Sequence, residues 1–442
     1  MSNSFFEKTF KLSQHKTTVS TEVLAGLTTF MTMAYILAVN PGILSAAGMS
    51  FSGVFTATAL SAMVATLVMG LYANMPFALA PGMGLNAFFA FTVVLGMGYT
   101  PQFALTAVFV EGLIFILLTA LNIREAILNC IPLNLKKSIS VGIGLFIAFI
   151  GLYNAGAGIV IQGTGIPLDI ADITSGAPLV TIIGLLITGS LLVFKVRGAL
   201  FLGIIATTVI GIPMGVTKLP ESIFSSPPAP ILFAFEWHNI LTVDFLFILF
   251  TFLFVDMFDT VGTLIGVATK ADMLDDQGRL PNAKKALFAD AVGTTVGACL
   301  GTSTVTTYVE SASGVAEGGR TGLSAVVTAL FFFLALFFSP LFAVIPGAAT
   351  APVLILIGLF MLTPIKDIDF EDYTESIPSF LTFIIMPLTY SIANGIMWGV
   401  TSYIVLKTVA GRGREVPVLT WFIAALFIIK IIFPVFIQGT LE

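Results

Sequence analysis

The stretch Leu241–Phe258 reads LTVDFLFILFTFLFVDMF and carries two charged side chains, Asp244 and Asp256. A second run, Leu323–Phe338, reads LSAVVTALFFFLALFF and carries no charge. A helix needs roughly 20 apolar residues, each rising about 1.5 Å, to cross the ~30 Å hydrocarbon core of a bilayer. Runs of this length and composition therefore predict helices that span a membrane.

The chain as a whole has the composition of a membrane protein. Of its 442 residues 57% are hydrophobic and 10% are charged, and the mean hydropathy is +1.04. A soluble globular chain carries about 25% charged residues, so these charges are too few to cover a soluble domain of this size. The two cysteines form no CxxC motif and no His/Cys cluster. We therefore expect no metal site and no cofactor, and we assign no nucleic-acid partner.

Apolar windows between charged breaks predict fourteen or fifteen spans. We expect them at 22–39, 53–72, 81–98, 101–121, 131–153, 178–194 and 198–216, and then at 241–268, 284–300, 305–320, 322–343, 345–363, 377–392 and 394–410. A further apolar stretch, 417–437, is either the fourteenth span or an extra one. The chain thus divides into an N-terminal segment (1–21), a first set of spans (22–216), a proline-rich outer loop (217–240) and a second set (241–442).

Lysine and arginine are distributed unequally about these spans. With the N-terminus inside, seventeen of the 19 fall on the inner side, while Lys218 lies in an outer loop and Lys430 within the last apolar stretch. Cytoplasmic loops of membrane proteins carry an excess of these residues. The first 20 residues lack the apolar core of a secretory signal. We therefore expect a multi-pass protein of the cell membrane with a cytoplasmic N-terminus.

The two halves share a short pattern. Ile131-Pro132 is followed after eleven residues by Gly144-Leu145-Phe146, and Ile345-Pro346 is followed after eleven residues by Gly358-Leu359-Phe360. Each copy falls on the fifth span of its half, and an odd number of spans inverts the second copy. A chance match stays open, but the shared position favours an inverted repeat of seven plus seven spans. Transporters with this architecture bind substrate near the midplane, where discontinuous helices meet.

Two segments at corresponding places interrupt the helical pattern, one in the third span of each half. Ala78–Phe88 reads ALAPGMGLNAF, and its Pro and paired Gly break a helix. Gly301–Ser311 reads GTSTVTTYVES, and its Thr/Val/Tyr run favours extended backbone. Non-helical backbone survives at membrane depth only where protein or a wet cavity satisfies its polar groups. Two ordinary surface loops are the alternative, but the symmetry of placement favours a central site.

Acidic residues within the predicted spans are costly unless they face a cavity or a partner, and five of them are candidates for a function. They are Glu111, Asp256, Asp259, Asp290 and Glu310. For Glu111 and Asp290 a hydrogen bond between packed helices is as good an interpretation as a function. For Asp259, in the middle of its helix, and Glu310, at a helix start where the dipole favours negative charge, we favour a function.

Four motifs resemble those of the AzgA-like purine permeases. They are TEVLAGLTTFMTMAYILAVNP (21–41), PFALAPGMGLNAFFAF (76–91), FLFVDMFDTVGTLIGVATKA (252–271) and GTSTVTTYVESASGVAEGGRTGL (301–323). The resemblance runs from about residue 22 to about residue 406, and four motifs in order leave little room for chance. It implies uptake of adenine, guanine and hypoxanthine together with protons.

The resemblance also implies a fold, because the family is related to the nucleobase–ascorbate transporters and uracil permeases. We expect an all-α polytopic membrane protein with about fourteen spans in two inverted repeats. Spans 1–4 and 8–11 would form a core domain, and spans 5–7 and 12–14 a gate domain. Short antiparallel β-segments in spans 3 and 10 would meet at the substrate, and a homodimer through the gate domains is implied as well.

Carried over by motif, the substrate-binding residues are Asn86 in the third span, Asp259 in the eighth and Glu310 in the tenth. Uracil and xanthine permeases commonly have Glu at the eighth-span position and Asn after the tenth-span acid. Here these positions hold Asp259 and Ser311. The departures match the AzgA-like branch and weaken any transfer of a uracil-binding pose.

These side chains suit a neutral purine, which presents N–H donors and ring-nitrogen acceptors along a flat edge. A carboxylate accepts two N–H bonds side by side, the Asn86 amide can donate and accept, and the Tyr308 ring can stack on or flank the base. We expect Glu310 to hold the purine and Asp259 to be the main proton carrier. Asp290 is the third candidate for proton coupling.

Two other classes of function stay open. The same fold could carry uracil, xanthine or a small anion, although an anion would favour cations and helix N-termini at the broken spans. A membrane-embedded enzyme or channel is the other alternative. The spans contain no HExxH motif, no GxSxG motif and no Lys/His pair.

Overall fold

The structure is a computed structural model. It describes residues 5–121, 132–153, 157–220, 222–270, 273–274, 280–418, 420–421 and 424–425. Within these ranges, eight helices are long and apolar enough to cross a membrane, and two shorter apolar helices lie at Met83–Gly96 and Ala199–Gly211. The chain is therefore a mostly helical, multi-pass membrane protein. Ile131 and most of the stretch 417–437 lie outside the described residues.

The helices and strands follow one another in an order close to the predicted spans. The first half holds α1 (Phe5–Phe10), α2 (Val19–Met33), α3 (Ile36–Ala46), α4 (Phe51–Val68), β1 (Leu79–Pro81), α5 (Met83–Ala87), α6 (Pro101–Ala120), α8 (Leu133–Leu152), β2 (Val160–Ile161), β3 (Asp169–Ile170), α9 (Gly176–Val193) and α10 (Ala199–Gly211). The second half holds α11 (Val243–Lys270), α12 (Ala283–Leu300), β4 (Val305–Thr307), α13 (Ser311–Ala316), α14 (Gly322–Ala335), α15 (Ser339–Ala343), α16 (Gly347–Met361), α17 (Tyr373–Leu388) and α18 (Ile392–Val409).

Several helices begin where the sequence supplies a cap. Ser50 accepts a hydrogen bond from Gly53 N at the start of α4, and Thr100 accepts one from Phe103 N at the start of α6. Such side chains satisfy backbone donors that a helix start leaves without an intrahelical partner. Pro101 occupies the first turn of α6, where its missing N–H costs nothing.

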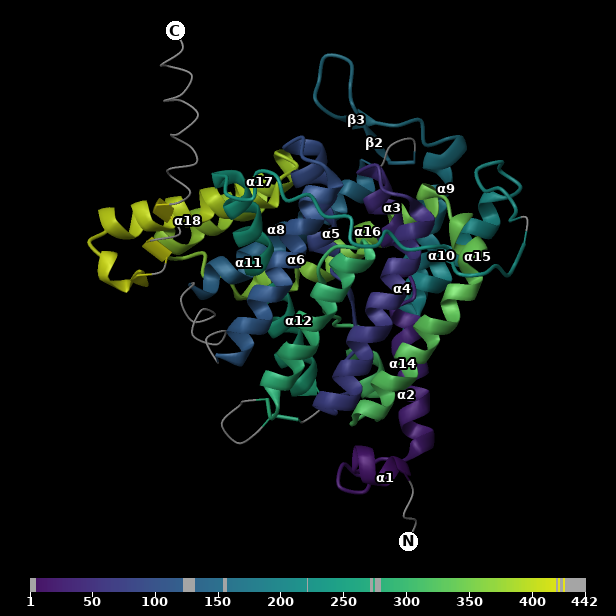
Figure 1. The fold of residues 1–442 in the computed structure, drawn as a ribbon. Helices are drawn as coiled ribbons and strands as arrows, with labels where there is room; N and C mark the ends of the chain where they lie inside the picture. Colours follow the sequence, from purple (N-terminus) through teal and green to yellow (C-terminus); the bar gives the residue numbers. More distant parts are fainter. Residues whose placement is uncertain are drawn as a thin grey trace.

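Three segments differ from the predicted spans. The first span is interrupted at Ala34–Tyr35 and its second part runs on to Ala46, beyond the expected end at residue 39. The tenth span contains only one short helix, α13, which is preceded by β4. The hairpin β2–β3 was not expected, and Figure 1 places it at the end of the molecule opposite α1.

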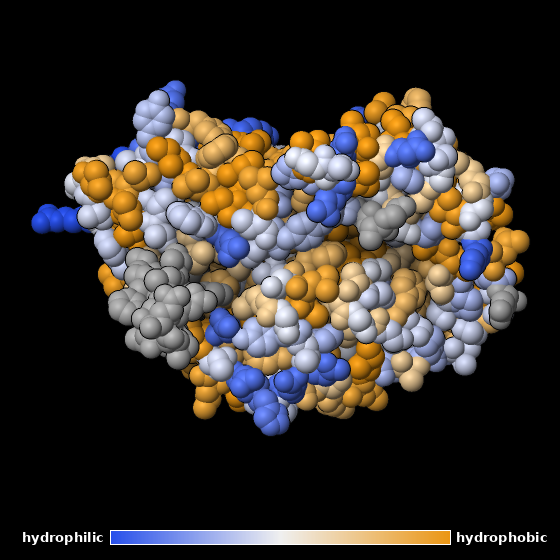
Figure 2. Space-filling view, turned by 90° about the horizontal axis from the view of Figure 1, so that it is seen from above, coloured by the Kyte–Doolittle hydropathy of each residue, from blue (hydrophilic) through white to orange (hydrophobic). Residues whose placement is uncertain are grey.

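The long helices α2, α4, α12 and α14 run side by side (Figure 1). Figure 2 looks onto the end of the molecule opposite α1, where hydrophobic residues lie among hydrophilic ones. Some of the most exposed large apolar side chains lie on helices, for example Val193 of α9 at 78% and Leu388 of α17 at 71%. Large apolar areas are rare on soluble monomers, so this surface fits a lipid environment.

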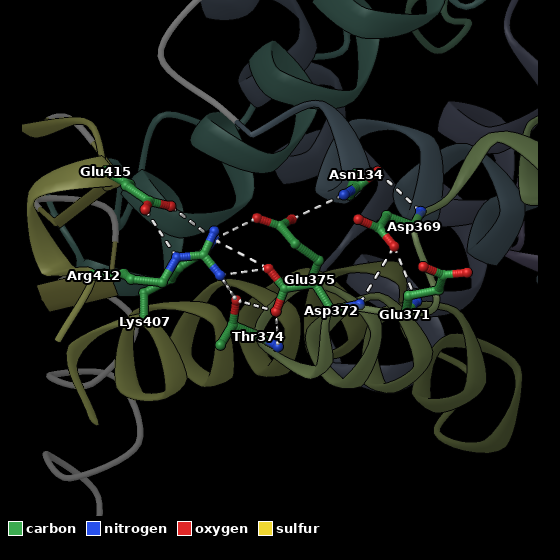
Figure 3. Close-up of polar contacts among 9 residues, drawn as sticks. All are labelled: Asn134, Asp369, Glu371, Asp372, Thr374, Glu375, Lys407, Arg412 and Glu415. Atoms are coloured by element: carbon green, nitrogen blue, oxygen red, sulfur yellow. Dashed lines mark hydrogen bonds and ion pairs between the residues drawn. The ribbon is translucent and has the colours of Figure 1, made fainter. Parts of the chain in front are cut away.

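A buried cation joins α17, α18 and the turn that follows α18 (Figure 3). Lys407 is 1% exposed, and its Nζ lies 2.8 Å from Glu375 Oε1 and 3.1 Å from Glu415 Oε2. Arg412 Nη1 lies 2.5 Å from Asp372 Oδ2. Hydrogen bonds from Arg412, then from Thr374, hold the pKa of the Asp372 carboxyl below its ordinary value. The ion cluster thus fixes the hairpin of α17 and α18.

Replacing Lys407 by Met should lower the free energy of unfolding by about 2–3 kcal/mol, because it leaves neighbouring carboxylates without their buried partner. Thermal unfolding of the purified protein in detergent measures this.

The contribution of the ion cluster to the free energy of unfolding should depend on pH. Since the pKa of Asp372 is lowered in the folded state, this contribution is complete above the ordinary carboxyl pKa of about 4 and falls as the pH drops below it. For Lys407→Met, the control is Lys366→Met, since Lys366 is exposed. An equal loss of stability in both variants would contradict that prediction.

Candidate substrate-binding site

Two short strands meet inside the molecule, in the two segments where the sequence interrupts the helical pattern. β1 and β4 pair antiparallel, with Leu79 opposite Thr307 and Pro81 opposite Val305. Two further backbone bonds extend the pairing, from Gly82 N to Thr304 O (2.9 Å) and from Tyr308 N to Ala78 O (3.0 Å). Segments more than 200 residues apart in sequence therefore form one unit.

Threonine hydroxyls satisfy the outer edges of both strands. Thr66 of α4 accepts from Leu79 N (3.0 Å) and donates to Leu79 O (3.2 Å). Thr294 of α12 does the same for Val305, at 3.2 Å from its N and 2.9 Å from its O. Extended backbone at membrane depth needs such internal partners. A threonine hydroxyl from a neighbouring helix therefore satisfies backbone polar groups of each of the two strands in the same way.

The carbonyl oxygen of Pro81 accepts hydrogen bonds from both interrupted segments, Ala78–Phe88 and Gly301–Ser311. It accepts from Tyr308 Oη at 2.5 Å and from Asn86 Nδ2 at 3.4 Å. Asn86 Oδ1 in turn accepts from Ser303 Oγ. Asn86 is fully buried and Tyr308 is 5% exposed. Both predicted site residues therefore hold the strands together, in addition to any contact with a substrate.

Glu310 lies directly before α13, at the helix start expected from the sequence. Its Oε1 accepts a hydrogen bond of 2.6 Å from Tyr35 Oη, at the interruption between α2 and α3. The Tyr35 hydroxyl thus orients one carboxylate oxygen of Glu310. Sequence reasoning missed Tyr35, because a tyrosine in an apolar run gives no signal of a partner 275 residues away.

Asp259 belongs to the middle of α11 and is half-buried. Its carboxylate lies close enough to Asp290 and Glu310 to interact with both electrostatically. Tyr35 and Tyr308 are also within electrostatic reach of Asp259 and Glu310. The structure therefore gathers Asp259, Glu310 and Tyr308 in one place.

The other acids form hydrogen bonds behind the strands. Glu111 Oε2 accepts from Thr304 Oγ1 at 2.6 Å, and Asp290 Oδ1 accepts from Thr260 Oγ1 at 2.6 Å. Asp256 also lies against Thr260, at 3.3 Å. The helix-packing interpretation left open for Glu111 and Asp290 thus has a structural basis.

A cavity of about 420 Å³ opens next to this site. Its lining includes Glu310, Thr28 and Thr32 on one side and Arg197, Leu200 and Phe360 on the other. At its edge Arg197 forms an ion pair with Glu317, with 2.5 Å between Nη2 and Oε1. The cavity provides a route by which a small molecule could reach Glu310. Among the residues described, no group of three or more His, Cys, Asp or Glu is arranged to hold a metal ion.

Comparison with solved structures identifies the fold. The transmembrane domain of the cyanobacterial bicarbonate transporter BicA is similar with a TM-score of 0.64, over 86% of this chain and 97% of that one. The two sequences are 16% identical, so the likeness concerns the fold alone.

Curated relatives match over nearly the whole chain. The adenine permease AdeQ of Escherichia coli is 43% identical, over 96% of this chain and 95% of its own length. The guanine/hypoxanthine permease PbuG of Bacillus subtilis is 44% identical, over 96% of this chain and 99% of its own length. A model of the Permease family matches residues 20–398. By its relatives this protein is a transporter, and it belongs to the Permease family.

Proposed function

We propose that this chain imports purine nucleobases across the cell membrane together with protons. The observation that carries the proposal is the position of Glu310, which follows the paired strand β4, lines the cavity and lies within electrostatic reach of Asp259. Relatives at 43–44% identity are named as adenine and guanine/hypoxanthine permeases, which supports a purine as the substrate.

Glu310 holds the N–H edge of the base in this proposal. Tyr35 already donates to its Oε1, which leaves further lone pairs of the carboxylate for N–H donors. Charge-assisted bonds of this kind are roughly twice as strong as neutral ones. Tyr308 flanks the base, and Asn86 keeps the strands and the start of α5 in register through Pro81 and Ser303.

Asp259 carries the proton, with Asp290 next to it. Asp259 accepts no hydrogen bond from the part of the chain that the structure describes, whereas Glu310 has Tyr35. A carboxylate without donors in a low-dielectric site has little to hold it ionised. Asp259 is therefore the better proton acceptor of the two.

An inverted repeat of seven plus seven spans is the architecture we propose. The glycines of the two GLF motifs, Gly144 and Gly358, pack on each other where α8 and α16 cross. A Cβ on Gly358 would lie 2.5 Å from Gly144 O, and a Cβ on Gly144 would lie 2.8 Å from Gly358 O. A reciprocal contact between equivalent residues is what a two-fold axis between the repeats produces.

The linkers α9–α10 and α17–α18 support the same repeat. Lys195 and Tyr390 both adopt a left-handed backbone, with φ of 55° and 53°. The next residue in each linker, Val196 or Ser391, donates from its N to a carbonyl five residues earlier. The two linkers thus end their helices in the same way.

The gate domain of this proposal consists of spans 5–7 and 12–14, and the core domain holds the site. The cavity lies between them, since α2 and α13 belong to the core and the α9–α10 linker and α16 to the gate. Arg197 and Glu317 pair across this boundary. Movement of the core as one body against the gate would carry the site between the two faces of the membrane. The face with α1 is the cytoplasmic one.

Uptake of radiolabelled adenine, guanine and hypoxanthine into permease-deficient cells tests the function. Uptake of at least one purine, with competition by the others and none by uracil, is expected. Uptake of uracil or of an inorganic anion instead would overturn the assignment.

Purine uptake should fall strongly when a protonophore collapses the pH gradient, and it should not depend on sodium. The reason is that carboxylates meet at the site, while the residues described include no group of three or more His, Cys, Asp or Glu arranged to hold a metal ion. Initial rates in sodium and in choline buffers, each with and without protonophore, measure this. A rate that follows sodium and ignores the protonophore would contradict proton coupling.

A further inference from the structure

The buried hydroxyl of Thr260 connects two acids, Asp256 and Asp290, to strand β4. Thr260 Oγ1, on α11, lies 2.6 Å from Asp290 Oδ1, 3.3 Å from Asp256 Oδ1 and 2.7 Å from Thr306 Oγ1. All four side chains are within 1% of complete burial. Three elements, α11, α12 and β4, therefore meet at a single oxygen atom.

We propose that Thr260 is a positioning residue that passes the protonation state of Asp290 to strand β4. The inference rests on the proposed proton-coupled transport. Thr306 is paired with Ala80 of β1, and Tyr308 and Glu310 lie two and four residues after it in the chain. A change at Thr260 therefore reaches the substrate-binding residues through one short segment of backbone.

Counting protons explains how the hydroxyl can act. When Asp256 and Asp290 are both ionised, the three contacts of Thr260 share two protons, one from its own hydroxyl and one from Thr306. Thr306 donates to Thr260, and Thr260 can donate to one aspartate at a time. The contact between Thr260 Oγ1 and the other aspartate is then one between two acceptor oxygens, with no proton between them.

Binding of a proton at Asp290 Oδ1 completes the network. The new O–H of Asp290 donates to Thr260 Oγ1, and the Thr260 hydroxyl turns its own proton toward Asp256. Thr260 then accepts two hydrogen bonds and donates one, which is the full capacity of a hydroxyl. The step forms one O–H bond on Asp290 with a proton taken from the site, and it breaks no bond within the network.

Other titratable groups approach from each neighbouring element. Asp259, on α11, is within electrostatic reach of Asp290. Glu111, on α6, holds Thr304 just before β4. Neither contacts the Thr260 hydroxyl in the hydrogen bonds described. Thr260 is thus the direct link between the aspartate pair and the strand.

The test separates coupling from binding in proteoliposomes with radiolabelled hypoxanthine. Thr260→Val keeps the shape of the side chain and removes the hydroxyl. It should lower proton-driven accumulation by about tenfold or more, the effect of losing a hydrogen bond to a charged group. Exchange of labelled for unlabelled base, which needs no net proton movement, should change by less than about threefold.

Two variants act as controls. Thr260→Ser keeps the hydroxyl and should restore accumulation to the wild-type value. Thr251→Val removes another buried hydroxyl of α11, whose bond goes to the carbonyl of Phe247 in the same helix, and it should leave both assays unchanged. If Thr260→Val cannot be purified, Thr306→Val breaks the same link from the strand side and should give the same pattern.

Accumulation by Thr260→Val or Thr306→Val at the wild-type level would overturn the inference. Equal loss of exchange and accumulation would do so as well, because it would indicate a purely structural role, and so would a Thr260→Ser variant as impaired as Thr260→Val. Absence of proton-driven accumulation in the wild type would instead overturn the proposed function.

Discussion

Purine binding by the Glu310→Gln variant is expected to be at least about a hundredfold weaker than in the wild type. The amide places an N–H₂ donor where the base needs an acceptor, and hydrogen bonds to a charged group contribute about 1.5–3 kcal/mol each. The variant also gives Tyr35 a neutral acceptor in place of a charged one. Isothermal titration calorimetry on the purified protein measures the affinity.

Asp259→Asn should behave differently, because we assign to Asp259 the proton and not the base. It should keep measurable purine binding and lose proton-driven accumulation. Glu371→Gln, an exposed carboxylate in the loop before α17, is the matched control and should bind like the wild type. If Asp259→Asn abolishes binding while Glu310→Gln retains it, the two acids have the opposite roles.

Gly358→Ala should destabilise the protein by about 2 kcal/mol, even though alanine favours a helix by about 1 kcal/mol over glycine. The new Cβ would lie 2.5 Å from Gly144 O and 2.6 Å from Ala148 Cβ. Backbone and Cβ atoms cannot turn away, so α8 and α16 must separate. Thermal unfolding in detergent measures the loss, and Gly358→Leu should prevent accumulation of folded protein.

Gly189→Ala provides the comparison. Gly189 lies in α9, and a Cβ there would meet no atom within 4 Å. This variant should be as stable as the wild type or more stable by up to about 1 kcal/mol, from helix propensity alone. If Gly358→Ala is no less stable than Gly189→Ala, the two helices do not depend on the close glycine contact.

The sequence predicted the two interrupted segments well, because their cause is local. Pro81 and Gly82 cannot continue a helix into one of them, and the β-branched run Val305–Thr307 favours extended backbone in the other. Glu310 at a helix start followed from the same reasoning. The membrane class followed from composition, which does not depend on contacts at all.

Other features depend on partners far along the chain and had no local signal. Tyr35 meets Glu310, and Thr260 meets Asp290 and Thr306, only because the helices pack as they do. The short length of α13 was missed although the chain carries a local signal for it, because Gly318 and Gly319 follow Glu317 and both disfavour a helix. Hydropathy gives the position of a span but not the residue at which its helix stops.

The α9–α10 and α17–α18 linkers have the same backbone conformation but are held by different kinds of contact. Beside Lys195, Arg197 reaches a carboxylate, Glu317. Tyr390, with the same backbone, packs instead against aromatic rings of Phe91, Phe146, Phe149 and Tyr153. Salt screens an exposed ion pair, whereas cooling weakens apolar contacts. We therefore expect ionic strength and temperature to act independently on the two linkers: concentrated salt should weaken the Arg197 ion pair, and cold should weaken the contacts of Tyr390.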